Sequence, residues 1–260
     1  MITFRKLGRF GRLGNQLFQY AGTRIYAESN GFRYTFPAWP GNNFFENIPQ
    51  STFLDNIKTK FLPTAQLDDV VSYGKIDKIK YLAGLKKKLL ETINISELYE
   101  KPRDNISLYG YLQDDFSLNL LNDNKKAIKE WFTFKNHINN SYQQLIKKPF
   151  IGMHIRRGDL VKRNLTVPID GYVKTLNKIR NGRDLFIATD DRTLLSELGY
   201  LDPLAFKNPL PEIPDYIFDF WMLKNAETVI GGGSTFSWWA SFLGTGDYYS
   251  PPLNHLWEKQ

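Results

Sequence analysis

The sequence contains no cysteine, which excludes disulfides, thiol nucleophiles and every metal or iron–sulfur site built on thiolates. Histidine is scarce too, and the separation of His137, His154 and His255 along the chain argues against a histidine-rich zinc site. Asp-x-Asp does not occur, so a metal ion that bridges two phosphates would lack its usual pair of acids. A Walker-type Gly-Lys-Ser/Thr is also missing, which argues against a P-loop nucleotide hydrolase.

Long hydrophobic runs are absent as well. No window approaches the roughly 18 apolar residues that a membrane-spanning helix needs, and the first six residues turn polar too soon for a signal peptide. We therefore expect a cytoplasmic protein with at most a peripheral contact at the inner face of the membrane. Lys86-Lys87-Lys88 is the run that would make such a contact with anionic lipid, although runs of this kind more often form a solvated face.

The composition is that of an ordinary folded chain with an excess of positive charge. Hydrophobic residues make up 42% of the chain and charged residues 23%, values that exclude wholesale disorder. The net charge of +7 favours anionic partners such as phosphorylated metabolites, an acidic membrane or nucleic acid. We expect no nucleic-acid partner, because the basic residues are dispersed and no nucleic-acid motif is present.

Strands and helices alternate along the chain, which predicts an α/β fold with parallel sheets. The first half is expected to contain strands over 2–7 and 108–112 and helical segments over 15–29, 76–95 and 117–147. The second half is expected to contain strands over 150–155, 185–189 and 228–230 and helices over 171–180, 191–199 and 215–226. We predict two lobes, an N-terminal one over 1–147 and a C-terminal one over 148–260.

Two polar segments follow the first two strands of the C-terminal lobe. Arg156 and Arg157 lie just past a strand, where ligands bind in open parallel sheets, and a guanidinium suits a phosphate. Alone, this segment fits a solvated basic turn better. Asp190 and Asp191 follow the next strand, where a carboxylate accepts hydrogen bonds from guanine or ribose, or caps a helix. We expect one of these aspartates to be a cap and the other to be free for a ligand.

A third segment, from Gly231 to Phe236, joins the last of these strands to an apolar helix and is the most informative. Glycines permit close approach of the backbone, and the N-terminus of a helix offers free N–H groups to a phosphate. A tight turn with Ser234 or Thr235 as N-cap is the alternative. Because all three segments follow strands of one lobe, they predict one crevice for a nucleoside diphosphate, with arginine and N–H groups in place of a metal ion.

Several segments resemble α-1,2-fucosyltransferases (glycosyltransferase family 11). The stretch from Gly11 to Ala21, Gly-Arg-Leu-Gly-Asn-Gln-Leu-Phe-Gln-Tyr-Ala, is similar to the N-terminal signature of that family. Ser234–Trp239 is similar to its third motif, and His154–Asp159 to the arginine motif shared with α-1,6- and protein O-fucosyltransferases. Gly110–Gln113 and Ala188–Asp191 sit where the family has similar segments. In order and spacing the resemblance covers nearly the whole chain.

The resemblance implies a GT-B-like pair of Rossmann-type lobes with parallel sheets facing a cleft. The C-terminal lobe would hold GDP-fucose and the N-terminal lobe the acceptor. The implied reaction is an inverting transfer of L-fucose to a galactoside hydroxyl, with an α-1,2 linkage to a terminal galactose and no metal or other cofactor. A fucosyltransferase with another linkage or acceptor, and a non-catalytic protein that binds a GDP-sugar or a glycan, are the alternatives. The oligomeric state is left open.

Residue roles follow from the same resemblance. Arg156 would hold the β-phosphate and assist its departure, and Asn15 would lie near the fucose and the acceptor hydroxyl. His154 and Asp190, with Asp191 as the less favoured alternative, would read guanine or ribose. The implied donor-binding set is His154, Arg156, Arg157, Asp190, Asp191, Gly233, Ser234, Thr235 and Phe236.

The general base is less determined. Asp159, Asp114, Asp115 and Glu28 are the acids that qualify, and the sequence does not rank them; Asp159 would alternatively pair with an arginine of its own loop. Gly233, Leu17 and Leu160 depart from the usual Asn, Met and aromatic residue of the family at those positions. These departures bear on the choice of acceptor more than on the choice of donor.

Overall fold

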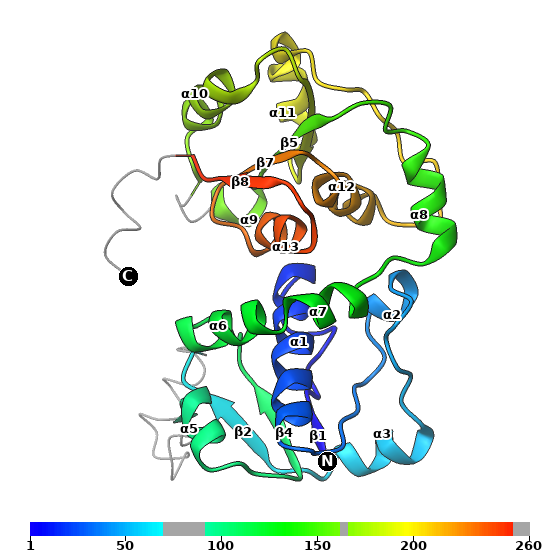
Figure 1. Cartoon of the computed structure of the whole chain (residues 1–260), viewed down its shortest axis with the longest axis vertical. Helices are drawn as coiled ribbons and strands as arrows, with labels where there is room; N and C mark the ends of the chain where they lie inside the picture. The colour runs from blue at the N-terminus through cyan, green and yellow to red at the C-terminus, as the bar shows by residue number, and fades with distance from the viewer. Residues whose placement is uncertain (70–91, 162–165, 252–260) are drawn as a thin grey trace. The chain divides into compact units, whose positions relative to one another are not determined.

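The computed structural model of the chain describes residues 1–69, 92–161 and 166–251, without the side chains of Asp159 and Leu160. The chain forms two compact units, Met1–Thr133 and Phe134–Gln260. Each unit contains a four-stranded sheet in which neighbouring strands run parallel (Figure 1). The predicted α/β, GT-B-like fold class is thereby confirmed. Most of the helix predicted over 76–95, with Lys86–Lys88, lies outside the described residues.

The N-terminal unit is built on a sheet of strand order β1-β4-β2-β3. The strands are β1 (Ile2–Thr3), β2 (Thr64–Leu67), β3 (Thr92–Ile93) and β4 (Ile106–Tyr109). The helices described in this unit are α1 (Leu13–Ser29), α2 (Gly41–Phe44), α3 (Phe53–Thr59), α5 (Ile95–Glu100), α6 (Asp115–Asp123) and α7 (Lys125–Trp131). The strand predicted over 2–7 is shorter than expected, since the chain leaves the sheet after Thr3, and the strand predicted over 108–112 lies instead at 106–109.

Helix α1 is the central helix of the N-terminal unit and confirms the helix predicted over 15–29. Apolar residues recur along it, and most of its side chains are buried. Asn30 ends it, and Gly31 follows in the left-handed conformation with a φ of 66°. The buried ring of Tyr20 packs on Phe36 and Trp39 at centroid distances of 4.5 and 5.5 Å. These contacts join α1 to the segment that follows it.

The C-terminal unit has the strand order β6-β5-β7-β8. The strands are β5 (Phe150–Ile155), β6 (Asp184–Thr189), β7 (Thr228–Gly231) and β8 (Asp247–Tyr249). The helices described are α8 (Asn136–Gln143), α9 (Gly158–Val161), α10 (Ile169–Ile179), α11 (Arg192–Glu197), the short 3-10 helix Gly199–Leu201, α12 (Asp215–Lys224) and α13 (Thr235–Leu243). The three strands and three helices predicted for this region are confirmed, with ends shifted by a few residues.

Helix α8 belongs to the second unit, although the predicted boundary after residue 147 placed it in the first. Its side chains explain why. The indole of Trp221 in α12 donates a hydrogen bond to Asn139 Oδ1 at 3.1 Å, and the ring of Tyr142 packs on the same indole at 5.5 Å. The segment over 117–147 is helical as predicted, but its last helix packs with the residues that follow it.

The two faces of the C-terminal sheet carry different residues, because successive side chains of a strand point to opposite sides. Met153 and Ile155 of β5 pack with Tyr172 and Leu176 of α10 in a buried apolar cluster. On the other face, a Cβ atom at Gly152 would lie 2.9 Å from Leu223 of α12, so a larger residue there would require the Leu223 side chain to shift. Figure 1 shows α10 and α11 on one side of this sheet and α12 and α13 on the other. His154 therefore faces the α12–α13 layer.

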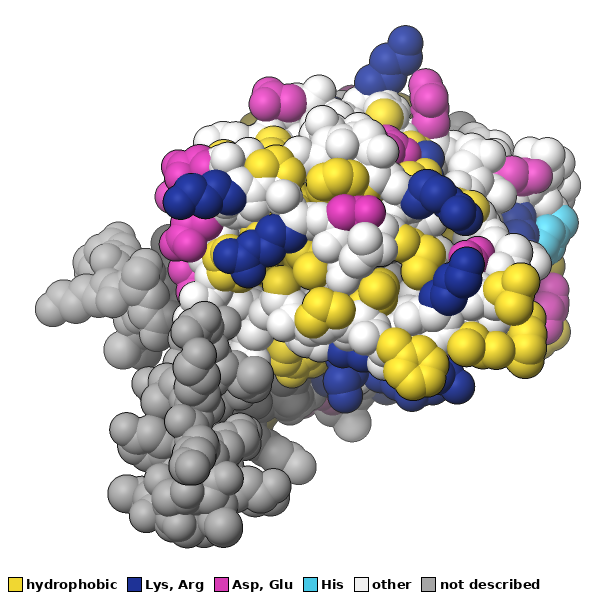
Figure 2. Space-filling model, turned by 90° about the horizontal axis from the view of Figure 1, so that it is seen from below, with side chains coloured by type: hydrophobic (Ala, Val, Ile, Leu, Met, Phe, Trp, Pro, Cys, Tyr) yellow, Lys and Arg dark blue, Asp and Glu magenta, His cyan; other side chains and the backbone are white. Residues whose placement is uncertain are grey.

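Helix α3 in the N-terminal unit is unusual because its apolar side chains point to solvent. Phe53, Leu54 and Ile57 are exposed, as is Phe61 just after the helix. Figure 2 shows a face of the molecule on which hydrophobic side chains lie among Lys and Arg side chains. Across the described ranges, no helix is both long and apolar enough to cross a membrane.

Candidate functional site

The three polar segments of the C-terminal unit follow three neighbouring strands. In the register of the sheet, His154 of β5 lies beside Ala188 of β6 and Gly231 of β7. The strands end at nearly the same level, so Arg156, Asp190 and the glycine loop emerge at one edge of the sheet. β5 lies between β6 and β7; the chain runs from β5 to β6 on one side and then passes back across β5 to β7 on the other. A crevice for ligands forms at such a point in open α/β sheets.

His154 is buried at this edge against the first turn of α13. Its ring lies 5.0 Å from the ring of Phe236, and its Nδ1 atom has no hydrogen-bond partner among the described residues. The pKa of His154 is lowered to about 4, chiefly because the ring is buried; the Asp190 carboxylate opposes this shift and the Arg156 charge adds to it. The imidazole is therefore neutral near pH 7. A buried ring nitrogen without a partner suits a polar atom of a ligand.

Asp190 holds the arginine loop, the segment with Arg156 and Arg157 that follows β5. Its Oδ1 atom accepts hydrogen bonds from the backbone N–H groups of Arg157 and Gly158, at 2.8 and 3.1 Å. A Cβ atom at Gly158 would collide with the Asp190 carboxylate, which explains why glycine stands there. Asp190 therefore orders the arginine loop, whereas the sequence suggested that one aspartate of the pair would be free for a ligand.

Asp191 is the helix cap of the pair, as predicted for one of the two. Its side chain accepts a hydrogen bond from the Thr193 N–H at 3.2 Å at the start of α11, and its Oδ2 atom lies 3.3 Å from Arg157 Nε. This ion pair directs Arg157 toward the β6 loop. Arg156 is half-buried, and its charge acts on His154. The two adjacent arginines thus have different surroundings.

The glycine loop between β7 and α13 is packed on one side and open on the other. Tyr248 donates a hydrogen bond to the Gly231 carbonyl at 3.0 Å, and a Cβ atom at Gly232 would collide with the hydroxyl of Tyr172. Gly233 is exposed, has a φ of 66°, and has space around the position of a Cβ atom. The backbone can therefore approach a ligand closely at Gly233.

Ser234 begins the helix beyond this loop. Its buried side chain accepts a hydrogen bond from the Phe236 N–H at 3.3 Å, so Ser234 is the N-cap of α13 and its hydroxyl is used locally. Thr235, the first residue of the helix, is half-buried. The start of α13 offers backbone N–H groups and the positive end of the helix dipole to an anion.

Asn15 lies in the other unit, near the start of α1. Its Oδ1 atom accepts a hydrogen bond from Gln113 Nε2 at 3.0 Å, so two of the segments that carry the family resemblance meet there. Gln16 and Gln19 donate to the carbonyls of Gly11 and Phe10 at 2.9 and 3.0 Å. Amide side chains of α1 therefore close the preceding glycine loop.

Asp69 is a carboxylate that the sequence did not single out. It accepts hydrogen bonds from the backbone N–H groups of Tyr111 and Leu112, and Leu112 has a left-handed φ of 58°. Burial raises the pKa of Asp69, and those backbone hydrogen bonds oppose the rise. By holding this turn, Asp69 positions Gln113 and, through it, the side chain of Asn15.

Most acids considered as general bases have structural partners. Glu28 accepts hydrogen bonds from Arg24 Nε at 2.8 Å and Tyr34 at 2.9 Å, and it lies about 20 Å along α1 from Asn15 at 1.5 Å per residue. Asp114 is the N-cap of α6, and Asp115 is the first residue of that helix. Asp159 lies in α9, and its side chain is outside the described part of the chain.

Asp219 in α12 is a second acid that the sequence analysis missed. Burial raises its pKa to about 7, an effect that Asp215 strengthens and Arg192 opposes. Arg192 donates to Asp215 at 2.9 Å and follows directly on Asp191, so this cluster adjoins the β6 loop. The available signal was a carboxylate within an apolar stretch of the helix, between Phe218 and Phe220.

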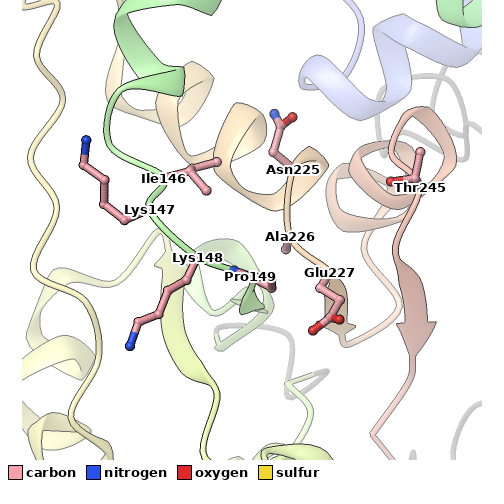
Figure 3. Close-up of a pocket in the computed structure, with 8 residues that line it drawn as sticks. All are labelled: Ile146, Lys147, Lys148, Pro149, Asn225, Ala226, Glu227 and Thr245. Atoms are coloured by element: carbon pink, nitrogen blue, oxygen red, sulfur yellow. The ribbon is translucent and has the colours of Figure 1, made fainter.

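A surface hollow of about 390 Å³ lies at the opposite edge of the same sheet (Figure 3). Its lining residues come from the amino ends of β5 and β7 and from the loop before β8: Ile146, Lys147, Lys148, Pro149, Asn225, Ala226, Glu227 and Thr245. Lys148 pairs with Asp184 at 3.2 Å and Glu227 with Arg183 at 2.8 Å. Its charged groups are thus partly neutralised, and it is separate from the edge that holds His154.

Solved structures of fucosyltransferases resemble this chain. The α-1,6-fucosyltransferase NodZ, co-crystallised with GDP, matches with a TM-score of 0.59 at 19% identity, over 94% of this chain and 92% of that one. POFUT1 in complex with GDP-fucose matches with a TM-score of 0.58 at 14% identity, over 96% and 97%. This chain has a fucosyltransferase fold. A NodZ structure from Bradyrhizobium gives 0.56 at 16% identity, over 94% and 92%.

No protein-family model and no curated protein sequence matches the chain. The likeness to these solved structures covers nearly the whole chain, although the sequence identity is only 14–19%. Among the residues that the structure describes, no group of three or more His, Asp or Glu side chains is arranged to hold a metal ion.

Proposed function

We propose that this protein is a fucosyltransferase that moves L-fucose from GDP-fucose to a hydroxyl of a galactoside, with an α-1,2 linkage to a terminal galactose. One observation carries the proposal. The arginine loop, the partnerless ring nitrogen of His154 and the open glycine loop lie at one sheet edge, in a chain with the fold of proteins crystallised with GDP or GDP-fucose. The α-1,2 linkage rests on the motif segments Gly11–Ala21 and Ser234–Trp239.

In this proposal the protein acts on the charge of the leaving group. The bond between the fucose anomeric carbon and the β-phosphate oxygen breaks as the acceptor oxygen attacks from the opposite face, and GDP gains negative charge. Arg156 and the backbone N–H groups after Gly233 would stabilise that charge as it develops. Donors placed in this way lower the barrier and therefore raise kcat more than they strengthen substrate binding.

The remaining donor residues would select and orient the nucleotide. Neutral His154 offers its Nδ1 atom to the base or the ribose, and Phe236 packs beside it. Asp190 would act mainly by holding the arginine loop, and Asp191 and Arg157 by fixing the adjoining β6 loop. Ser234 and Thr235 would place the first N–H groups of α13 toward the diphosphate.

On the acceptor side, Asn15 would lie near the fucose and the acceptor hydroxyl, held by Gln113. The acceptor proton would pass to a general base, for which Asp159 is our candidate because it follows the arginine loop directly. We propose that no metal ion or other cofactor takes part, with arginine and backbone N–H groups meeting the charge of the diphosphate.

The test is a transfer assay with GDP-fucose and a panel of terminal galactosides, with EDTA present. We expect GDP release that depends on the acceptor, and a product whose linkage maps to the 2-hydroxyl of galactose. Another mapped linkage would overturn the α-1,2 assignment alone. Tight GDP-fucose binding without acceptor-dependent GDP release would instead establish a non-catalytic GDP-sugar-binding protein, and activity lost with EDTA would overturn metal independence.

A further inference from the structure

The helix α3 in the N-terminal unit presents an apolar surface that nothing in the proposed reaction uses. We define the α3 surface as the side chains of Phe53, Leu54, Ile57 and Phe61. Phe53 is 78% exposed and Phe61 82% exposed, and Leu54 and Ile57 are exposed as well. Large apolar side chains that gather at the surface mark a site of interaction with another molecule.

The geometry of the helix places these side chains together. At about 100° per residue, Phe53, Leu54 and Ile57 fall within one arc of about 100° around α3. The helix is held at its start by Thr52, whose hydroxyl accepts a hydrogen bond from the Asp55 N–H at 3.1 Å. Thr59, at its end, is buried. The apolar arc is thus presented by an ordered helix.

Lys and Arg side chains lie close to the α3 surface. Lys58, Lys60 and Arg33 are exposed, and Arg5 donates to the Lys60 carbonyl at 2.8 Å, which places its guanidinium beside the end of the helix. The acid in this helix, Asp55, is turned inward, with its side chain 17% exposed and 3.9 Å from Arg33. In Figure 2, Lys and Arg side chains lie beside hydrophobic ones on the face drawn there.

We propose that the α3 surface docks the protein on an anionic lipid bilayer. Aromatic and aliphatic side chains on one face of a short helix, flanked by Lys and Arg, suit the boundary between lipid headgroups and acyl chains. The cations would meet anionic headgroups. A second copy of the chain is a poorer partner, because a symmetric contact through this surface would bring like charges together.

The test is co-sedimentation with vesicles of phosphatidylcholine alone or with roughly 30% phosphatidylglycerol, at low and at high salt. We expect binding to the anionic vesicles that weakens with salt, and much weaker binding to the neutral vesicles. The double variant Phe53→Ser/Phe61→Ser should lower the partition coefficient by at least about tenfold, since it removes the deepest apolar contacts.

Charge and controls refine the result. Lys58→Glu/Lys60→Glu should weaken binding to anionic vesicles and leave the neutral vesicles unaffected. Two controls in the other unit should bind like the wild type: Tyr200→Ser, which alters a side chain that is 70% exposed, and Lys174→Glu/Lys178→Glu on α10. All variants change exposed side chains, so their Tm values should match that of the wild type and show that the chain remains folded.

Three outcomes would overturn the proposal. The first is equal vesicle binding by the wild type and Phe53→Ser/Phe61→Ser, and the second is no binding to anionic vesicles at all. The third is a dimer in sedimentation that this variant disrupts, which would assign the surface to a second copy. The assay needs neither donor nor acceptor, so its failure would leave the proposed fucosyl transfer untouched.

Discussion

Both units contain a strand followed by a glycine loop and a helix, yet the two loops are built differently. In the N-terminal unit, Gln16 and Gln19 donate to loop carbonyls, and a Cβ atom at Gly11 would lie 2.6 Å from the side chain of Asn15. In the C-terminal unit, Tyr248 and Tyr172 contact the loop at Gly231 and Gly232, and Gly233 has open space at the position of a Cβ atom.

The difference shows that a glycine loop before a helix predicts a turn between a strand and a helix, but does not by itself predict a ligand-binding site. The loop before α1 is filled by amide groups of its own helix, so its glycines serve packing and backbone conformation. The loop before α13 keeps one side open beside His154. The neighbouring side chains therefore decide which of two similar glycine loops keeps an open side.

The largest effect should come from the two adjacent arginines. Arg156→Ala should lower kcat/KM for fucosyl transfer by at least about 100-fold, the scale for removing one donor to a developing charge. Arg157→Ala should cause a smaller loss, because Arg157 is paired with Asp191. Steady-state kinetics on both variants would measure the contrast. Near-normal turnover by Arg156→Ala would refute its assigned role.

The tight packing of the glycine loop before α1 can be tested with glycine substitutions. Gly11→Ala should lower the free energy of unfolding by about 2–3 kcal/mol, because alanine is strained at a positive φ and collides with Asn15. Gly31→Ala is the matched control, with a φ of 66° and no neighbour within 4 Å. It should lose only about 1 kcal/mol, since it keeps the strain without the collision. Denaturant unfolding of both variants measures the difference, and equal losses would show that the loop is not tightly packed.

The buried acid of the C-terminal unit should give stability a pH dependence. The pKa of Asp219 is about 7 in the folded chain and near its ordinary value of 3.8 when unfolded. The unfolded state therefore ionises first, and this contribution to stability is lost as pH rises through the folded pKa. Relative to Asp219→Asn, the wild type should lose about 2 kcal/mol between about pH 5 and pH 8. Parallel curves of unfolding free energy against pH would show that Asp219 is solvated.

Gly233→Ala examines the open loop in the same way. Its added methyl group has space in the free protein, so stability should fall by only about 1 kcal/mol from the positive φ. The methyl group would stand where a diphosphate approaches the backbone, and GDP affinity should fall about tenfold by calorimetry. Gly182→Ala, with a φ of 71° and no near neighbour, should lose similar stability and keep GDP affinity. Unchanged affinity in Gly233→Ala would remove the loop from the donor site.

The smallest effect concerns His154. Because its pKa is about 4, GDP-fucose affinity should be nearly constant between about pH 6 and pH 8. GDP-fucose suits this measurement because a sugar-linked diphosphate lacks the second phosphate ionisation near pH 6. The Asp219→Asn background removes a buried carboxyl whose pKa of about 7 lies in this range. A break in affinity near pH 6.5 would show that His154 is accessible to solvent.

Much of the C-terminal unit could be predicted from the sequence, because its buried strands are continuous apolar runs and its helices have clear ends. The edge that gathers His154, Arg156 and the glycine loop followed from parallel strand order alone. The short strands β2, β3 and β8 were not predicted, because two to four residues show too little hydrophobic periodicity.

The chemistry of single side chains was harder to predict. Asp190 and Asp69 act through hydrogen bonds to backbone groups 33 and 42–43 residues away, and local sequence does not reveal such partners. The pKa of Asp219 depends on tertiary burial. The resemblance of motifs identified Asn15, but the structure was needed to show that Gln113 holds it.

The hydrogen bonds from the arginine loop to Asp190 have a consequence for protein engineering. The segments that follow β5 and β6 depend on each other, because the Asp190 carboxylate after β6 fixes the backbone of the segment after β5. Grafting the arginine stretch of another transferase into this scaffold should misdirect the guanidinium unless its companion aspartate is transplanted with it. Any exchange of this loop should therefore include both segments together.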